Sequence, residues 1–159
     1  MKAQRLDRVL TCYRIGDPDG EFPIFDATGS RLAPGRWNTP DTSVLYSNER
    51  FSTALLEKLV NGSGMLPPNQ HYIAITIPND VSYEVVDTAK LSGWDDAGAS
   101  VSRDHGAAWA RAQRSLILIA PSVVARLDDN IMTNPAHPEF ARLTHSLHQP
   151  VFWDTRLYR

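Results

Sequence analysis

The strongest constraint on the fold is the run at residues 115–120, whose sequence is SLILIA. After its first serine the run is continuously apolar, so it lacks the alternation of a strand that turns one face to water. This pattern predicts a strand that is buried on both faces of its sheet. Pro121 ends the run. Other parts of the chain are therefore expected to cover both faces of a central sheet.

The remaining elements intersperse helices and strands without the regular alternation of a parallel α/β protein. The predicted strands cover residues 9–15, 43–47, 72–77, 81–87, 130–134 and 150–157, and the predicted helices cover 48–60, 102–113 and 138–147. The turn at 78–80 predicts that its two flanking strands form a hairpin. We expect an α+β fold, a single domain over residues 1–159 with mixed central sheets and flanking helices.

Charge and cysteine content exclude several classes of protein. The net charge is −2, whereas proteins that bind a nucleic-acid backbone gather Lys and Arg into a basic patch, so a direct nucleic-acid interface is not expected. The single cysteine, Cys12, allows no intramolecular disulfide, which fits the reducing cytosol. No stretch suits a signal peptide or a membrane span. These features predict a cytoplasmic protein without a membrane interface.

An irregular stretch at residues 21–41, with three prolines and two glycines, carries the most informative motif, Gly35-Arg36-Trp37-Asn38. Long ordered loops of this kind are often functional. The motif places a planar cation beside an aromatic ring and an amide, after a glycine that lets the backbone approach a ligand. Such a motif is typical of an anion or nucleotide contact. A core role for Trp37 and a surface ion pair for Arg36 would also explain it.

Four further side chains are candidates for the same site. Tyr46 lies near the end of a predicted strand and Glu57 in the following helix, so both could border a cavity beneath the loop of Arg36. Helix periodicity alone places Glu57 on a solvated surface. Ser122 directly follows the buried strand, where sites in mixed sheets gather, and Ser115 lies at the other end of that strand. No G-x-S-x-G elbow surrounds Ser122, so a hydrolase nucleophile is not indicated.

The histidines and the charged residues of the second predicted helix indicate no further site. The five histidines lack metal-ligand spacing, so no bound metal is expected. The charged helix face is interpreted as a solvated surface. It consists of Arg103, Asp104, Arg111 and Arg114. The sequence contains neither a Walker loop nor a G-x-G-x-x-G motif, so any nucleotide must be held by a different architecture.

An ordered series of short motifs resembles the RES domain family. The motifs are Tyr13-Arg14-Ile15, Gly35-Arg36-Trp37-Asn38, Val44-Leu45-Tyr46, Ala54-Leu55-Leu56-Glu57, Gly93-Trp94, Pro121-Ser122, Asn134-Pro135-Ala136-His137-Pro138 and Phe152-Trp153-Asp154-Thr155-Arg156-Leu157. No single motif is diagnostic, but the ordered set covers nearly the whole chain. The chain departs from the usual form of the family at Pro34, where a second glycine commonly precedes the Gly-Arg-Trp-Asn run.

The resemblance implies a fold similar to the ADP-ribosyltransferases and the role of a toxin in a bacterial type II toxin–antitoxin system. Such a toxin consumes NAD by breaking the nicotinamide–ribose bond, as a glycohydrolase, a phosphorylase or an ADP-ribosyltransferase. NAD is then a substrate, and no cofactor is implied. The implied partner is a cognate Xre-type antitoxin, which would make any DNA contact indirect. A homo-oligomer within the toxin–antitoxin complex is compatible with the resemblance.

The family is named for an arginine, a glutamate and a serine, and the resemblance implies that these are Arg36, Glu57 and Ser122, with catalytic roles. Tyr46 is implied as the aromatic partner, and Arg31 also fits a family arginine. The residues implied to bind NAD are Arg31, Arg36, Tyr46 and Ser122. Two choices stay open at this point, between Arg31 and Arg36 as the main phosphate contact and between Ser122 and its alternative at the start of the buried strand, Ser115.

The implied chemistry suits these side chains. Loss of nicotinamide leaves an oxocarbenium-like ribose, so the protein must hold the diphosphate and stabilise positive charge. Arg36 can clamp phosphate oxygens, Glu57 can favour the cation and Tyr46 can stack the nicotinamide. Water, phosphate or a protein could accept the ADP-ribose. The alternatives are a catalytically inactive interaction module of the RES fold and an RNA-cleaving toxin, although the acidic net charge offers little support for the latter.

Overall fold

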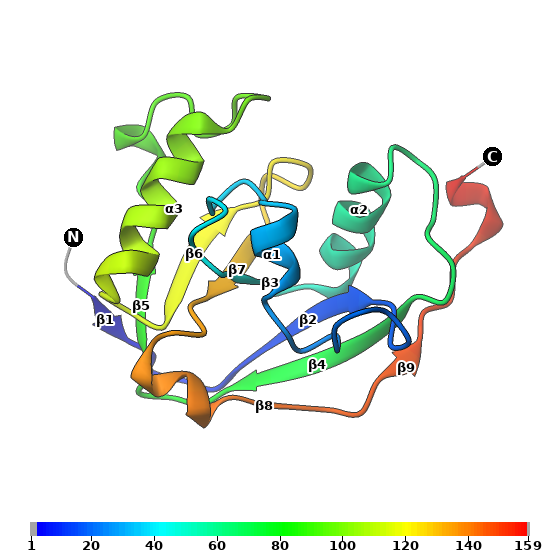
Figure 1. Ribbon diagram of the computed structural model, residues 1–159, viewed down its shortest axis with the longest axis horizontal. Helices are drawn as coiled ribbons and strands as arrows, with labels where there is room; N and C mark the ends of the chain where they lie inside the picture. Colours follow the sequence, from blue (N-terminus) through cyan, green and yellow to red (C-terminus); the bar gives the residue numbers. More distant parts are fainter. Residues whose placement is uncertain (1–2, 159) are drawn as a thin grey trace.

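Strands from every part of the chain form one mixed sheet in the computed structural model, which describes residues 3–158 (Figure 1). The strands are β1 (Gln4–Arg5), β2 (Leu10–Gly16), β3 (Leu45–Asn48), β4 (His71–Ile77), β5 (Ser82–Val85), β6 (Ile117–Pro121), β7 (Asp129–Thr133), β8 (Thr144–His145) and β9 (Gln149–Pro150). Their order is β1-β5-β6-β7-β3-β2-β4-β8, and β9 also pairs with β4. The pair β5–β6 is parallel and the other pairs of the path are antiparallel.

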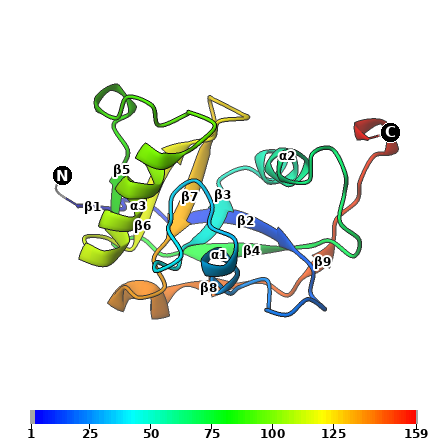
Figure 2. The same ribbon diagram turned by 45° about the horizontal axis from the view of Figure 1, so that its top comes forward.

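Two long helices lie on one side of this sheet, near its opposite ends (Figure 2). Helix α2 (Phe51–Asn61) packs on β2 and β3, and α3 (Ser100–Ala112) lies over β5 and β6. The one-turn helix α1 (Gly29–Leu32) lies between them. The 3-10 helices are η1 (Thr88–Lys90), η2 (Pro138–Arg142) and η3 (Thr155–Leu157). The arrangement confirms the α+β class. No helix within residues 3–158 has the length and hydropathy needed to cross a lipid bilayer.

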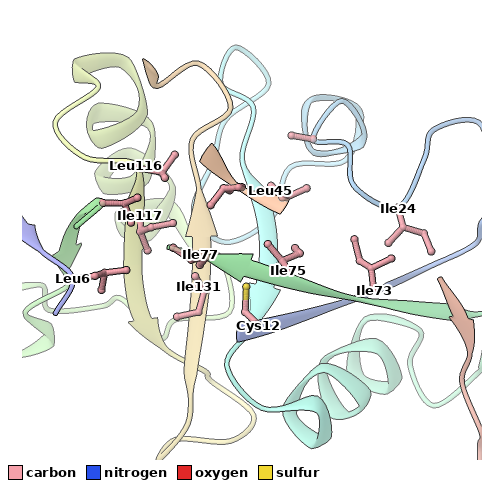
Figure 3. Close-up of a cluster of buried hydrophobic side chains, with 13 residues drawn as sticks. Leu6, Cys12, Ile24, Leu45, Ile73, Ile75, Ile77, Leu116, Ile117 and Ile131 are labelled. Atoms are coloured by element: carbon pink, nitrogen blue, oxygen red, sulfur yellow. The ribbon is translucent and has the colours of Figure 1, made fainter. Parts of the chain in front are cut away.

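Strands β6 and β7 bury side chains on both faces of the sheet. Ile117 and Ile131 belong to the core that Figure 3 shows. The next residue along each strand, Leu118 or Met132, belongs to a second core with Trp109 of α3. Because neighbouring residues of a strand point to opposite faces, the two cores lie on opposite sides of the sheet. The prediction that the apolar run forms a strand buried on both faces is confirmed.

The predicted hairpin between β4 and β5 is wrong. Strand β4 pairs along its whole length with β2, and its other edge pairs with β8 and β9. Strand β5 instead pairs with β1 and with β6. The turn residue Asp80 has a left-handed backbone with φ of 65°, and its amide donates to the carbonyl of Leu6. The turn therefore carries the chain to a different part of the sheet, because both edges of β4 are already paired.

The last predicted helix and the last predicted strand are also wrong. The helix expected at residues 138–147 is shortened to η2, because the chain then becomes extended and pairs with the edge of β4 as β8. The strand expected at 150–157 is shortened to β9. Pro150 of β9 pairs with His71, which is the first residue of β4, so the chain beyond Pro150 has run past the end of its partner strand.

Glu139 of η2 ties the C-terminal segment to the start of β5. Its carboxylate accepts hydrogen bonds from the amide and the hydroxyl of Ser82, at 2.9 and 2.7 Å, and pairs with Arg5. Burial by itself would raise the pKa of Glu139, but these hydrogen bonds outweigh it and lower the pKa from 4.5 to about 2. Because the folded pKa is the lower one, the carboxylate stabilises the fold above about pH 4.5, and this contribution is lost as the pH falls toward 2.

We expect Glu139→Gln to destabilise the protein by about 1–3 kcal/mol at pH 7, because a charge-assisted pair becomes a neutral one. At pH 2.5 the wild-type carboxylate has lost most of its advantage, so the two proteins should melt at nearly the same temperature. Thermal melting at both pH values measures the difference. Glu21→Gln, at an exposed position, is the control for the change in net charge. An equal loss of stability at both pH values would contradict the linkage.

Candidate active site

A cleft of about 820 Å³ is lined by residues of the sheet and of both long helices, α2 and α3. Its floor is β3, which contributes Tyr46, Ser47 and Asn48. Helix α2 and the end of β2 form one side of the cleft. The loop at residues 33–37 and the start of α3 form the other side. The irregular stretch that carries the Gly-Arg-Trp-Asn motif therefore closes over a strand of the central sheet.

This loop is fixed by Asn38, which is completely buried. Its Oδ1 accepts hydrogen bonds from the amide of Gly35 at 2.8 Å and from the hydroxyl of Tyr46 at 2.7 Å. Its Nδ2 donates to the carbonyls of Ser30 and Thr42 at 2.7 and 2.9 Å. A carboxamide offers both an acceptor and two donors, which is what the position requires. The asparagine of the motif therefore holds the loop and does not face a ligand.

Gly35 is required by the close approach of the Tyr46 ring. A Cβ atom at position 35 would lie 2.7 Å from both Cζ and the hydroxyl oxygen of Tyr46. The same hydroxyl accepts a hydrogen bond from the amide of Trp37 at 3.0 Å. Burial raises the pKa of the Tyr46 hydroxyl, so it stays protonated at physiological pH and keeps its bond to Asn38. The ring thus forms a fixed part of the cleft floor.

Tyr46→Phe is expected to destabilise the loop although it keeps the ring. The substitution leaves the amide of Trp37 without a partner and removes a donor to Asn38, and an unpaired buried group costs about 1–3 kcal/mol. For a chain of this size, Tm should fall by about 2–4 °C per kcal/mol. Tyr83→Phe is the matched control, since the Tyr83 hydroxyl bonds only the exposed side chain of Gln4. Equal melting temperatures for both variants would refute this role.

Arg36 and Arg103 bring two guanidinium groups to the loop side of the cleft. Nη1 of Arg36 donates to the carbonyls of Trp94 and Asp96 at 2.9 and 2.8 Å, which leaves its Nε and Nη2 for a ligand. Nε of Arg103 donates to the carbonyl of Gly35 at 3.1 Å. The interpretation of Arg103 as part of a solvated helix face is wrong. Helix periodicity does not show that the loop at residues 33–37, called the motif loop below, packs against the first turn of α3.

Glu57 lines the cleft from α2, and Ser122 holds its carboxylate in place. The Ser122 hydroxyl donates to Oε1 of Glu57 at 2.7 Å and accepts from the amide of Ala125 at 3.1 Å. Glu57 is half-buried, not solvated as periodicity alone indicates. Ser122 is completely buried and does not line the cleft, although the next residues, Val123 and Val124, do. In this geometry Ser122 fixes the position of Glu57.

Two of the predicted site residues lie elsewhere. Arg31 is exposed, its Nε donates to the carbonyl of Pro40 at 3.3 Å, and it does not line the cleft. Ser115 is completely buried away from the cleft, where it accepts from the indole of Trp109 at 2.8 Å and donates to Glu84 at 3.1 Å. The predicted residues that the structure brings together are Arg36, Tyr46, Glu57 and Ser122.

Sequence reasoning missed Arg14 as a residue of the cleft. Its Nη1 donates to the carbonyl of Tyr46 at 2.9 Å. This bond helps to join β2 to β3, for which the described strands share one backbone pair, Tyr13 with Asn48. Its other nitrogens donate to the carbonyls of Ile24 and Asp26 at 2.6 and 3.3 Å. Burial lowers the pKa of Arg14, although the group remains charged. A charged residue inside a β-prone run was the signal that could have found it.

Lys58 was missed as well. It follows Glu57 on α2, lines the cleft, and donates from Nζ to the carbonyl of Ile15 at 3.4 Å. The charged residues of the cleft are the cations Arg14, Arg36, Lys58 and Arg103 and the carboxylate Glu57. An excess of positive charge in a concave site favours an anionic ligand. Within residues 3–158, no group of three or more His, Cys, Asp or Glu side chains is placed to hold a metal ion.

Similar proteins include named toxins. The Prs ADP-ribosylating toxin of Sphingobium sp. (strain YBL2) is 33% identical over 157 residues, which cover 96% of this chain and 95% of that protein. Toxin Res of Photorhabdus laumondii subsp. laumondii is 27% identical over 154 residues, covering 94% of this chain and 98% of that protein. A chain in the crystal structure of the M. tuberculosis MbcT–MbcA toxin–antitoxin complex matches with a TM-score of 0.71 and 14% identity, over 92% of this chain and 86% of that one.

The structural match shows a shared fold, and the sequence matches extend over almost the full length of both relatives. The profile of the RES domain matches residues 11–154. That range contains every residue that lines the cleft. The chain belongs to the RES domain family.

Proposed function

We propose that this protein is the toxin of a bacterial toxin–antitoxin pair and consumes NAD by breaking the nicotinamide–ribose bond. The observation that carries the proposal is the convergence of Arg36, Tyr46 and Glu57 in one cationic cleft, with Ser122 fixing the glutamate. The name of one relative, an ADP-ribosylating toxin, supports this activity, and the name of another, Toxin Res, supports the role of a toxin. An inactive interaction module would not need to keep these side chains together.

In this proposal, the diphosphate of NAD binds between Arg36 and Arg103. Both guanidinium groups are anchored by backbone carbonyls, so their direction is set before a ligand arrives. Within residues 3–158, each keeps N–H groups without a protein acceptor. A planar guanidinium can bind phosphate oxygens with two parallel hydrogen bonds. Preorganised donors of this kind contribute more to affinity than donors that must first be ordered.

Glu57 is the group that acts on the reacting ribose. Breaking the bond between C1′ and the nicotinamide nitrogen leaves positive charge on the ribose and a neutral leaving group. A carboxylate that already points at this charge stabilises the transition state without reorganisation. The hydrogen bond from Ser122 at 2.7 Å restrains the Glu57 carboxylate, so Ser122 is a positioning residue in this mechanism. Tyr46 supplies an aromatic surface in the cleft floor on which nicotinamide can stack.

The proposed partner is an antitoxin protein. The structural neighbour was solved as a toxin–antitoxin complex, and the resemblance noted for the sequence implies an Xre-type antitoxin. Any contact with DNA would then be made by the antitoxin, in agreement with the net charge of −2.

The test is to incubate the purified protein with NAD, with and without phosphate and cell lysate, and to identify the products by mass. EDTA is present throughout, because the proposed mechanism uses no metal. We expect release of nicotinamide in step with the loss of NAD. NAD that stays intact in every mixture would refute the proposal and favour the interaction module.

A further inference from the structure

Two asparagines that line the cleft are bonded to each other across the sheet. Asn48 of β3 and Asn130 of β7 are directly opposite in the register of the two strands, so their side chains lie on the same face. The Nδ2 atom of Asn48 donates a hydrogen bond to Oδ1 of Asn130. Asn48 is buried, with 8% of its surface exposed. Neither asparagine has a role in the NAD cleavage proposed above.

The sheet itself does not require a carboxamide at either position. Asparagine is depleted from strands, whose pleated surface favours β-branched and aromatic side chains. The next pair on the same face, Tyr46 with Met132, is aromatic and apolar, and Met132 is completely buried. A pair of valines or threonines would serve these strands at least as well. The two carboxamides therefore indicate a ligand that needs them.

The bonded pair keeps an acceptor and a donor for such a ligand. Within residues 3–158, neither Oδ1 of Asn48 nor Nδ2 of Asn130 has a hydrogen-bond partner in the protein. Neither atom is fully buried, so both are accessible from the cleft that the two residues line. An acceptor oxygen repels the oxygen of an anion and attracts an N–H group. The complementary ligand group therefore carries an N–H donor beside an acceptor, as a carboxamide does.

The pair lies beside the groups proposed to act on the nicotinamide ribose. Asn48 is two residues from Tyr46 on β3, so both side chains are on the same face of the strand. Asn130 lies on β7, which pairs with β6 up to the point where Ser122 holds Glu57. A nicotinamide ring on Tyr46, with its ribose at Glu57, would have its carboxamide next to the asparagine pair.

We infer that Asn48 and Asn130 recognise the carboxamide of the nicotinamide group and so determine which dinucleotides the cleft accepts. The inference rests on the proposed NAD cleavage and names specificity residues for it. Oδ1 of Asn48 accepts a hydrogen bond from the NH₂ group of the carboxamide, and Nδ2 of Asn130 donates to its carbonyl oxygen. A site built to bond an N–H group rejects an analogue without it, because the acceptor of the protein is then left unpaired.

The experiment measures binding by calorimetry in the Glu57→Gln background, where turnover should be slow. The ligands are NAD and its 3-acetylpyridine analogue, in which a methyl ketone replaces the carboxamide and the N–H donor is lost. We expect NAD to bind about tenfold more tightly, the effect of one unpaired acceptor. Asn48→Leu should abolish this preference. Asn130→Leu should weaken both ligands by a similar factor and keep the preference, because both retain the carbonyl oxygen.

Asn79→Leu is the matched control, because Asn79 is exposed and lies outside the cleft. It should keep the full preference for NAD. A purely structural role of the pair would weaken both ligands equally in Asn48→Leu, and a preference that survives in this way would overturn the inference. Equal affinity for NAD and the analogue before any asparagine is changed would also overturn it, and that measurement does not depend on the folding of the asparagine variants.

Adenine also carries an N–H donor beside an acceptor, so the hypoxanthine analogue of NAD is a third ligand. A preference for NAD over this analogue that disappears in Asn48→Leu would show that the pair binds the adenine end, and would overturn the inference. Failure of the proposed function gives a different result, which is wild-type protein that releases no nicotinamide from NAD. Nicotinamide release together with equal binding of NAD and the acetylpyridine analogue would refute only the role of the asparagines.

Discussion

Glu57→Gln is expected to lower the rate of nicotinamide release at least 100-fold while leaving the fold intact. The substitution keeps the size of the side chain and an oxygen that can accept the hydrogen bond from Ser122. It removes the negative charge that would stabilise the cationic ribose, and loss of a preorganised electrostatic contact of this kind costs roughly 100- to 1,000-fold in rate. Nicotinamide measured by chromatography and Tm measured by thermal melting give the two quantities.

The control for this variant is Glu21→Gln, which makes the same change of charge at an exposed position. Its rate and its Tm should match those of the wild type. Turnover by Glu57→Gln at the wild-type rate would show that the carboxylate does not act on the ribose. A large fall in Tm would show that the loss of activity comes from unfolding. Glu57 would then be a residue that stabilises the fold and not one that acts on the substrate.

Gly106→Ala is expected to destabilise the protein by about 2 kcal/mol. Gly106 lies in α3 against the motif loop, and an added Cβ would lie 1.9 Å from the carbonyl oxygen and 2.6 Å from the carbonyl carbon of Trp37. Both atoms belong to the backbone, and the Trp37 side chain is completely buried, so neither partner can yield easily. Overpacking of this kind costs about 1–3 kcal/mol or more, against the roughly 1 kcal/mol that alanine gains over glycine within a helix.

A cost at the upper end of this range, less the gain, leaves about 2 kcal/mol. The measurable result is a fall in Tm of roughly 4–8 °C, at about 2–4 °C per kcal/mol for a chain of this size. Nicotinamide release should fall as well, because Trp37 stands between Arg36 and Asn38 in the motif. Gly98→Ala is the matched control, since an added Cβ at that position meets nothing within 4 Å. A stable Gly106→Ala protein would show that α3 and the loop are less closely packed than the structure indicates.

Features that depend on local pattern could be predicted from the sequence. The apolar run of β6 needs only its own composition to indicate burial on two faces, and Leu118 and Ile117 do enter opposite cores. Arg36, Tyr46 and Glu57 were found because the motifs around them resemble a family. Neither local pattern nor short motifs show which strands become neighbours in the sheet. The sequence therefore predicts a hairpin of β4 and β5, whereas β4 pairs with β2 and β5 pairs with β6.

The missed residues of the site share one property, which is that their position depends on contacts far along the chain. Arg103 reaches the cleft because the carbonyl of Gly35, 68 residues away, accepts from its Nε. Arg14 lies in the cleft because it bonds to Tyr46, 32 residues further on. Lys58 donates to the carbonyl of Ile15, 43 residues earlier in the chain. A helical or strand period carries no information at such separations, so a solvated face and a buried pocket look alike in the sequence.

Under the proposed function, the strand order determines when the newly made protein can first act on NAD. The cleft floor, β3, lies between β2, which is made early, and β7, which ends at Thr133. Pairing at such distances must await the whole intervening chain, and strands of this kind assemble slowly. A polypeptide still emerging from the ribosome, without β7 and the segment that holds Glu57 through Ser122, has no completed cleft. Harm to the host would then begin only after synthesis is nearly finished, which gives an antitoxin time to meet its target.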